Sequence, residues 1–173
     1  NCYVPIFGIC YGHQLIGLAS GFEVGKMKYG NRGHNIPCNL VGTEKCYITS
    51  QNHGYEVLLK NTLLFDNIDT NWKELFVNCN DGSNEGLIHL NKPIFSVQFH
   101  PEARAGPTDT TFLFDIFIDR CRNEFNVNDR IYNKVNENLN STEYVENIKN
   151  KINKILIHGS GGLSIGQAGE FDY

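Results

Sequence analysis

An apolar segment runs directly into a glycine-flanked cysteine near the start of the chain, in the sequence FGICYGHQ. The segment VPIFGI at residues 4–9 has the β-branched and aromatic content of a strand, whereas YGHQLIGLAS at residues 11–20 favours a helix. Cys10 therefore falls where a strand turns into a helix, with a glycine two residues to either side. A turn of this kind has the geometry of a nucleophile elbow. The junction predicts an α/β fold with Cys10 at the end of a strand.

The predicted position of Cys10 favours a reactive thiol. A helix N-terminus offers free N–H groups and a partial positive charge, which favour a thiolate over a thiol. The same N–H groups can stabilise an oxyanion. A cysteine taken alone is more often a small buried residue, so a purely structural role for Cys10 stays open. A nucleophile also needs a base and a residue that orients the base.

One of the six histidines ends an apolar strand and is the best candidate for that base. His100 closes the run PIFSVQF and is followed by Pro101, which stops the strand, and by Glu102. Residues two apart in an extended chain face the same side, so His100 and Glu102 can face one site. If the strands before Cys10 and His100 are neighbours in a parallel sheet, their carboxyl ends bring these residues together. The other histidines lie elsewhere in the sequence. His13 lies within the first helix, His34 and His53 follow turn-like stretches, His89 ends a strand beside polar residues, and His158 lies near the C-terminus.

Further strands are expected where β-prone runs are separated by turn signals such as NDGSNEG. These runs are residues 46–50, 74–78, 86–90 and 93–99. The segment KMKYGNRGH is interpreted as a surface loop that faces a partner domain.

Two helices are expected to frame this zone. The first is predicted to have Leu15, Leu18 and Ala19 on one face and to end at Gly21. The second, at residues 108–121, is predicted to have an apolar stripe made of Leu113, Phe117 and Cys121, with Phe114 and Ile118 beside it.

Composition and charge exclude several classes of protein. A chain of 173 residues with 40% apolar content suits one ordinary domain with a core. The net charge of −4 and the lack of a basic cluster argue against a nucleic-acid partner. No apolar run reaches the length of a membrane span. The six cysteines have no zinc-ligand spacing, so no metal site is expected, and a reduced, cytoplasmic setting is favoured over a disulfide framework.

Two further zones differ in composition from the first. Residues 123–153 are rich in Asn, Lys, Glu and Ile and predict a linker that is part helical and part disordered. Residues 154–173 contain an apolar strand and a Gly-rich turn, and they predict the start of a second domain, cut short. The Gly-rich turn does not fit a dinucleotide-binding fingerprint, because Ser164 takes the place of the last glycine.

Three motifs in order, GICYGHQL, ITSQNHGYEV and VQFHPEA, resemble the class I (triad-type) glutamine amidotransferases. The longer segments KMKYGNRGHNIP, NDGSNEGLIH and FSVQFHPEARAGPTDTTFLFDIFI look like the glutaminase domain of glutamine-dependent carbamoyl-phosphate synthetase. The resemblance implies that residues 1–122 are the C-terminal part of an amidotransferase domain, with a mostly parallel sheet flanked by helices. It also implies that residues 123–153 are a linker and that residues 154–173 begin the synthetase domain.

The resemblance implies a role for each matched residue. Cys10 would be the nucleophile, His100 the general base and acid, and Glu102 the residue that orients His100. Tyr11, where relatives commonly have Leu, would supply an oxyanion-hole N–H. Four further residues would line the glutamine pocket: Gln14, Asn52, Gly54 and Tyr55.

The same resemblance implies a reaction and its partners. Glutamine would be hydrolysed to glutamate and ammonia through a thioester, and the ammonia would pass through a channel to synthetase domains of the same polypeptide. Carbamoyl phosphate would form there from bicarbonate and ATP, as the first step of pyrimidine biosynthesis. No cofactor is expected in this part of the protein, whereas ATP with Mg or Mn is expected in the synthetase domains.

Two alternatives stay open. One is the glutaminase domain of another synthase, and the other is an amidotransferase-like regulatory or binding domain without catalysis. In the resembled family, upstream strands and a Gly-rich loop complete the oxyanion hole. A chain that starts at the elbow strand is therefore expected to have little glutaminase activity and marginal stability on its own.

Overall fold

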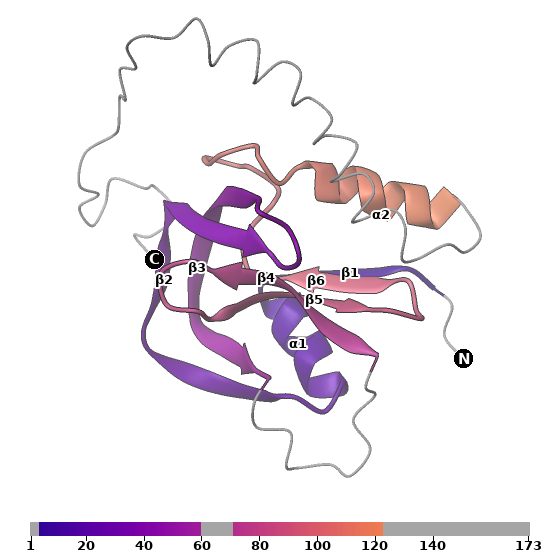
Figure 1. Ribbon diagram of the computed structural model, residues 1–173, viewed down its shortest axis with the longest axis horizontal. Helices are drawn as coiled ribbons and strands as arrows, with labels where there is room; N and C mark the ends of the chain where they lie inside the picture. The colour runs from indigo at the N-terminus through magenta and orange to yellow at the C-terminus, as the bar shows by residue number, and fades with distance from the viewer. Residues whose placement is uncertain (1–3, 60–70, 123–173) are drawn as a thin grey trace, which may run out of the picture.

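A computed structural model describes residues 4–59 and 71–122 of the chain. The expected linker (123–153) and synthetase start (154–173) lie outside the described residues. Within the described residues, strands and two helices follow one another (Figure 1). In order, they are β1 (Ile6–Ile9), α1 (Tyr11–Ala19), β2 (Glu23–Leu40), β3 (Cys46–Leu58), β4 (Trp72–Asn78), β5 (Asn84–His89), β6 (Ile94–Val97) and α2 (Phe112–Arg122).

The strands form one sheet in the order β1-β6-β5-β3-β2-β4, and β4 also pairs with β5. The strands β5, β3, β2 and β4 therefore close into a ring. The pair β1–β6 is parallel, in the register Ile6↔Ile94 to Ile9↔Val97, and the other described pairs are antiparallel. The expectation of a mostly parallel sheet is wrong. Antiparallel neighbours need only a short turn, whereas each parallel pair needs a long crossover connection. The described segments between β2 and β6 are strands and short turns.

The segment KMKYGNRGH, expected as a surface loop, is part of the long strand β2. It pairs with β3 through registers such as Lys26↔Tyr55 and Arg32↔Asn52, with a register shift between Lys26 and Asn31. Gly30 lies at this shift with a positive φ of 76°. The glycines make the segment resemble a loop in sequence, but here they allow a bulge in a strand. The expected turn NDGSNEG is confirmed in its first part, because residues 80–83 lie between β4 and β5 and Gly82 has a positive φ, whereas residues 84–86 belong to β5.

Two helices cover opposite faces of the sheet (Figure 1). Side chains along β6 and the residues that follow it point alternately to the two faces. Phe95, Val97 and Phe99 point to one face and join the core cluster that includes Leu113 and Ile116 of α2. The stripe of α2 therefore differs from the predicted one: Ile116 is buried and Cys121 is exposed. Ser96 and Gln98, which lie between these core residues, face α1 instead.

The face of α1 that carries the apolar residues expected from the sequence is not its buried face. Leu15 and Leu18 are 49% and 53% exposed, whereas His13 and Gly17 are buried. A Cβ atom at Gly17 would lie 2.8 Å from Val57 Cγ2, so the missing side chain lets the helix approach β3 closely. Gly21 has a positive φ of 89° and follows the end of the helix, as predicted.

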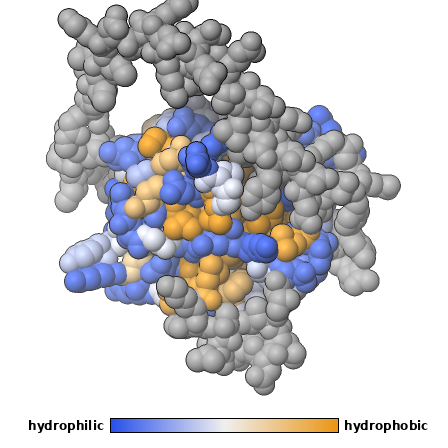
Figure 2. All heavy atoms as spheres, in the orientation of Figure 1, coloured by the Kyte–Doolittle hydropathy of each residue, from blue (hydrophilic) through white to orange (hydrophobic). Residues whose placement is uncertain are grey.

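Apolar residues gather in the middle of the face seen in Figure 2, and hydrophilic residues lie around them. No helix within residues 4–59 and 71–122 is long and apolar enough to cross a membrane.

Candidate active site

Cys10 occupies a strained turn between β1 and α1. Its φ of 51° and ψ of −104° lie outside the regions that residues with a side chain usually adopt. A Cβ atom at Gly8 would lie 2.5 Å from Ile16 Cδ1 and 2.8 Å from the carbonyl oxygen of Gly12. The strand and the first turn of the helix are therefore in contact at Gly8. The predicted elbow at Cys10 is confirmed.

The strands that precede Cys10 and His100 are neighbours, as their meeting at one site requires. The backbone N–H of Cys10 donates to the carbonyl oxygen of Val97 at 2.9 Å, and the N–H of His100 donates to the carbonyl oxygen of Ser50 at 2.8 Å. His100 Nδ1 lies 2.7 Å from Glu102 Oε1. Because Glu102 takes Nδ1, Nε2 is the ring nitrogen left to face Cys10.

The pKa of His100 is raised to about 9 in this arrangement. A hydrogen bond with Cys10 is the largest cause, the carboxylate of Glu102 adds to it, and burial acts in the opposite direction. The imidazole therefore keeps its proton through neutral pH. A protonated ring next to the cysteine is the state that can stabilise a thiolate and later donate a proton.

One wall of the site is formed by the middle of β3. The thiol of Cys10 lies 4.0 Å from the carbonyl oxygen of Asn52, and Gln14 Nε2 donates to the carbonyl oxygen of Tyr55 at 3.3 Å. The side chain of Tyr55 is half exposed, and a Cβ atom at Gly54 would have only Arg32 Nη2 within 4 Å. The predicted pocket residues Gln14, Asn52, Gly54 and Tyr55 thus lie together beside Cys10.

Tyr11 is the first residue of α1, and its side chain is 68% exposed. A residue at this position has a backbone N–H without an acceptor inside the helix. The N–H is next to Cys10 in sequence and can therefore face an oxyanion that forms at the thiol. His13, two residues later, points away from the elbow and makes a 2.9 Å contact between its Nδ1 and Ser96 Oγ.

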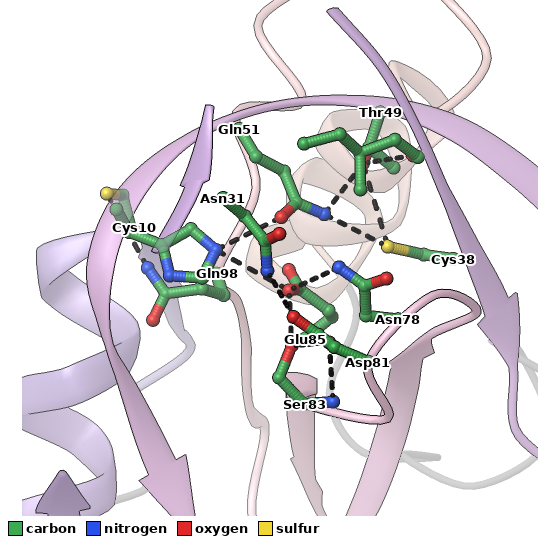
Figure 3. Close-up of polar contacts among 12 residues, drawn as sticks. Cys10, Asn31, Cys38, Thr49, Gln51, Asn78, Asp81, Ser83, Glu85 and Gln98 are labelled. Carbon is green, nitrogen blue, oxygen red and sulfur yellow. Dashed lines mark hydrogen bonds and ion pairs between the residues drawn. The ribbon is translucent and has the colours of Figure 1, made fainter. Parts of the chain in front are cut away.

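Gln98 was not predicted from the sequence, although it touches the thiol. Its Nε2 donates to Cys10 Sγ at 3.7 Å, and its Oε1 accepts from Gln14 Nε2 at 3.1 Å. Figure 3 shows the contact between Gln98 and Cys10. A signal was present in the sequence, because polar Ser96, Gln98 and His100 alternate with apolar residues. The alternation indicates a strand with one polar face.

His53 was also missed and lies in β3 rather than after a turn. Its Nδ1 lies 2.9 Å from the carbonyl oxygen of Tyr55, and its Nε2 lies 3.0 Å from Gln51 Oε1. Glu85 Oε1 is 3.5 Å from the same Nε2 and accepts hydrogen bonds from Asn78 and Ser83. Burial raises the pKa of Glu85. Figure 3 shows Gln51 and Glu85 in this network, which connects β3 to β5.

No group of three or more His, Cys, Asp or Glu residues able to hold a metal ion occurs within residues 4–59 and 71–122. The cysteines in these ranges are free, and Cys46 Sγ lies 3.8 Å from Cys79 Sγ on the surface.

Comparison with known proteins gives close relatives. The chain is 53% identical over 171 residues to multifunctional protein pyr-3 of Neurospora crassa, covering 98% of this chain and 9% of that protein. It is 50% identical over 175 residues to multifunctional protein URA2 of Saccharomyces cerevisiae, covering 98% of this chain and 7% of that protein. It is 58% identical over 119 residues to the carbamoyl phosphate synthase arginine-specific small chain of Aspergillus clavatus, covering 69% of this chain and 25% of that protein. The chain thus spans at most a quarter of the length of these relatives.

A solved structure shares the fold. A putative GMP synthase protein from Thermoplasma acidophilum matches with a TM-score of 0.54 and 23% identity, covering 79% of this chain and 62% of that one. The family model described as glutamine amidotransferase class-I matches residues 1–120. These residues include the elbow, the pocket wall and the His100–Glu102 pair. The chain therefore belongs to the class-I glutamine amidotransferase family.

Proposed function

We propose that this chain contributes the glutaminase site of a glutamine-dependent carbamoyl-phosphate synthetase. The observation that carries the proposal is the meeting of Cys10, at a strained elbow, with a protonated His100 that is oriented by Glu102. This arrangement suits nucleophilic acyl chemistry by a thiolate. Relatives at 50% identity or more include a carbamoyl phosphate synthase small chain, which supports this type of synthetase.

In the proposed reaction, the Cys10 thiolate attacks the side-chain amide carbon of glutamine. The backbone N–H of Tyr11 stabilises the oxyanion, and His100 Nε2 donates its proton to the departing ammonia. A glutamyl thioester remains on Cys10. His100, now neutral, takes a proton from water, the resulting hydroxide attacks the thioester, and glutamate leaves with Cys10 restored as a thiolate. Glu102 keeps the imidazole in position through its 2.7 Å contact with Nδ1.

The proposed binding residues form the walls around this chemistry. Gln14, Asn52, Gly54 and Tyr55 would contact the amino-acid part of glutamine, since they lie on the two elements that flank Cys10. Binding energy from this part of the substrate orients the amide toward the thiol.

The proposed partner is a set of synthetase domains on the same polypeptide, which would use the ammonia with bicarbonate and ATP in the cytoplasm. The matches support a fused arrangement, because the multifunctional relatives match 98% of this chain and the small-chain relative matches 69%. ATP with Mg or Mn would bind in those domains. The product, carbamoyl phosphate, would enter pyrimidine biosynthesis.

Labelling of the full-length protein with a diazo-ketone analogue of glutamine tests the proposal. Such an analogue alkylates the nucleophile that attacks glutamine, so peptide mapping should place the adduct on Cys10 and glutamine should protect against it. An adduct on another residue would contradict the assignment, and a failure to react would favour a non-catalytic domain. Ammonia formation that rises when ATP and bicarbonate are added would distinguish carbamoyl-phosphate synthesis from another synthase.

A further inference from the structure

One face of β6 and the residues after it point at the elbow. Ser96, Gln98 and His100 are spaced two apart, and each contacts a residue of the elbow or of α1. Ser96 Oγ lies 2.9 Å from His13 Nδ1, Gln98 Nε2 donates to Cys10 Sγ at 3.7 Å, and the hydrogen bond with Cys10 is the main cause of the raised pKa of His100. Two of these side chains therefore act on the sulfur, and only His100 has an assigned role.

The side-chain amide of Gln98 has a partner at both its oxygen and its nitrogen. The residue is fully buried, its backbone N–H donates to the carbonyl oxygen of Glu85 at 2.9 Å, and its Oε1 accepts from Gln14 Nε2 at 3.1 Å. A reversed amide would place two N–H groups against each other at Gln14 and an acceptor against the sulfur. Because Gln14 Nε2 also donates to the carbonyl oxygen of Tyr55, the network favours the orientation in which an N–H of Gln98 faces Cys10.

We propose that Gln98 is a positioning residue for the glutaminase reaction, whose buried amide fixes the Cys10 sulfur and stabilises it as a thiolate. The inference rests on the proposed role of Cys10 as the nucleophile. A hydrogen bond to an ionised acceptor is stronger than one to a neutral acceptor, so the N–H of Gln98 favours the thiolate over the thiol. Because the amide cannot take up the proton, it leaves proton transfer to His100.

The same amide connects the sulfur to the glutamine pocket. Gln14 donates both to Gln98 Oε1 and to the carbonyl oxygen of Tyr55. The pocket wall, Gln14, Gln98 and the thiol therefore form one continuous chain of hydrogen bonds. A sulfur held by this chain has a fixed position relative to the bound substrate, as an attack on the amide carbon requires.

The test uses the full-length protein and two variants, Gln98→Glu and Gln98→Met. The first keeps the shape of the side chain and replaces the donor by a negative oxygen, and the second removes the donor without adding a charge. The readouts are kcat and KM for glutamine, and the pH midpoint for alkylation of Cys10 by iodoacetamide, which follows the thiolate fraction. We expect Gln98→Glu to raise the midpoint by about one pH unit or more and to lower kcat by about 100-fold. We expect Gln98→Met to lower kcat by roughly 10-fold, with a smaller shift of the midpoint.

Ser96→Ala is the matched control, because it removes a buried hydrogen bond from the same face of the same strand without touching Cys10. Its midpoint should stay at the wild-type value. Wild-type kcat and midpoint in Gln98→Glu would overturn the inference, and so would equal midpoint shifts in Ser96→Ala and Gln98→Glu, which would indicate general loosening. If Gln98→Glu fails to fold, Gln98→Met decides by the same two readouts. A wild-type protein that neither hydrolyses glutamine nor reacts at Cys10 would instead contradict the proposed function itself.

Discussion

The backbone N–H of Cys10 donates a 2.9 Å hydrogen bond to the carbonyl oxygen of Val97, the last residue of β6. His100 lies three positions after Val97 in the sequence. The strand that ends at the proposed nucleophile is thus bonded directly to the strand that precedes the proposed base. The relative position of the two groups is set by backbone pairing in the sheet, so we expect changes at this junction to affect both folding and catalysis.

Removal of the Cys10 thiol should abolish glutaminase activity, but the choice of replacement should affect folding. Cys10 has a positive φ, which a glycine adopts at little steric cost. Backbone strain of this kind costs on the order of 1–3 kcal/mol, and the greater conformational freedom of glycine in the unfolded state offsets part of the gain from relieving it. We therefore expect Cys10→Gly to be more stable than Cys10→Ala by about 1 kcal/mol. Limited proteolysis of the two full-length variants would measure the difference. Faster cleavage of Cys10→Gly would contradict the claim of strain.

The pH dependence of catalysis should follow the state of His100. The pKa of His100 is raised to about 9, first by the hydrogen bond with Cys10 and further by Glu102. Release of ammonia needs the protonated ring, so kcat/KM should fall as the pH rises through about 9. Glu102→Gln removes one cause of the raised pKa, and the ring then loses its proton at a lower pH. The alkaline limb of the kcat/KM profile should move to lower pH in this variant. An unchanged limb would mean that another group controls it.

The close contact between strand and helix at Gly8 should be intolerant of a methyl group. In Gly8→Ala, the new Cβ would meet Ile16 Cδ1 at 2.5 Å and the carbonyl oxygen of Gly12 at 2.8 Å. The side chain of Ile16 can move, but the backbone oxygen can do so only if the elbow opens. We expect this variant to lose about 2 kcal/mol of stability or more, together with most of its activity.

Gly12→Ala is the matched control for the stability part of that prediction. A Cβ atom at Gly12 has nothing within 4 Å, and the residue lies in α1. Alanine should therefore stabilise the helix by about 0.5–1 kcal/mol. Resistance to limited proteolysis should rise in Gly12→Ala and fall in Gly8→Ala. If the two variants behaved alike, the contact at Gly8 would not be the cause.

The conformation of the loop after His100 should require a glycine at position 106, where a side chain has no room. A Cβ atom there would collide with Ser50 Oγ, and the carbonyl oxygen of Ser50 also accepts the backbone N–H of His100 at 2.8 Å. We expect Gly106→Ala to shift His100 and to lower kcat by roughly 10-fold or more. The double variant Gly106→Ala/Ser50→Ala removes the colliding oxygen and should recover much of the loss. The four rates form a double-mutant cycle, and additive effects would show that the two residues are not coupled.

The parts of the site with a local chemical signature were predictable from the sequence. A cysteine between two glycines at a strand-to-helix junction predicted the elbow, because the turn depends on residues that are adjacent in the chain. His100 and Glu102 were predictable for the same reason, since strand alternation and Pro101 determine how they face.

The antiparallel ring was not predictable in this way, because pairing depends on residues far apart in the sequence. Three glycines in β2 obscured its strand pattern, and the bulge that Gly30 allows is visible only against the partner strand. The apolar face expected for α1 is not its buried face, for a related reason. A close approach at Gly17 replaced the usual apolar contact, so the leucines of the helix remained exposed. Gln98 was missed because the alternation of Ser96, Gln98 and His100 indicates a polar strand face but not which element that face meets.

The parallel pairing of β1 with β6 also has a consequence for synthesis of the protein. Ninety residues separate Cys10 from His100 in the sequence. At a translation speed of about 5–20 residues per second, the cysteine is therefore synthesised on the order of ten seconds before the histidine. During this interval the thiol has neither its base nor the strand that fixes its backbone. If Cys10 is the nucleophile, as proposed, its site can form only after β6 has left the ribosome and paired with β1.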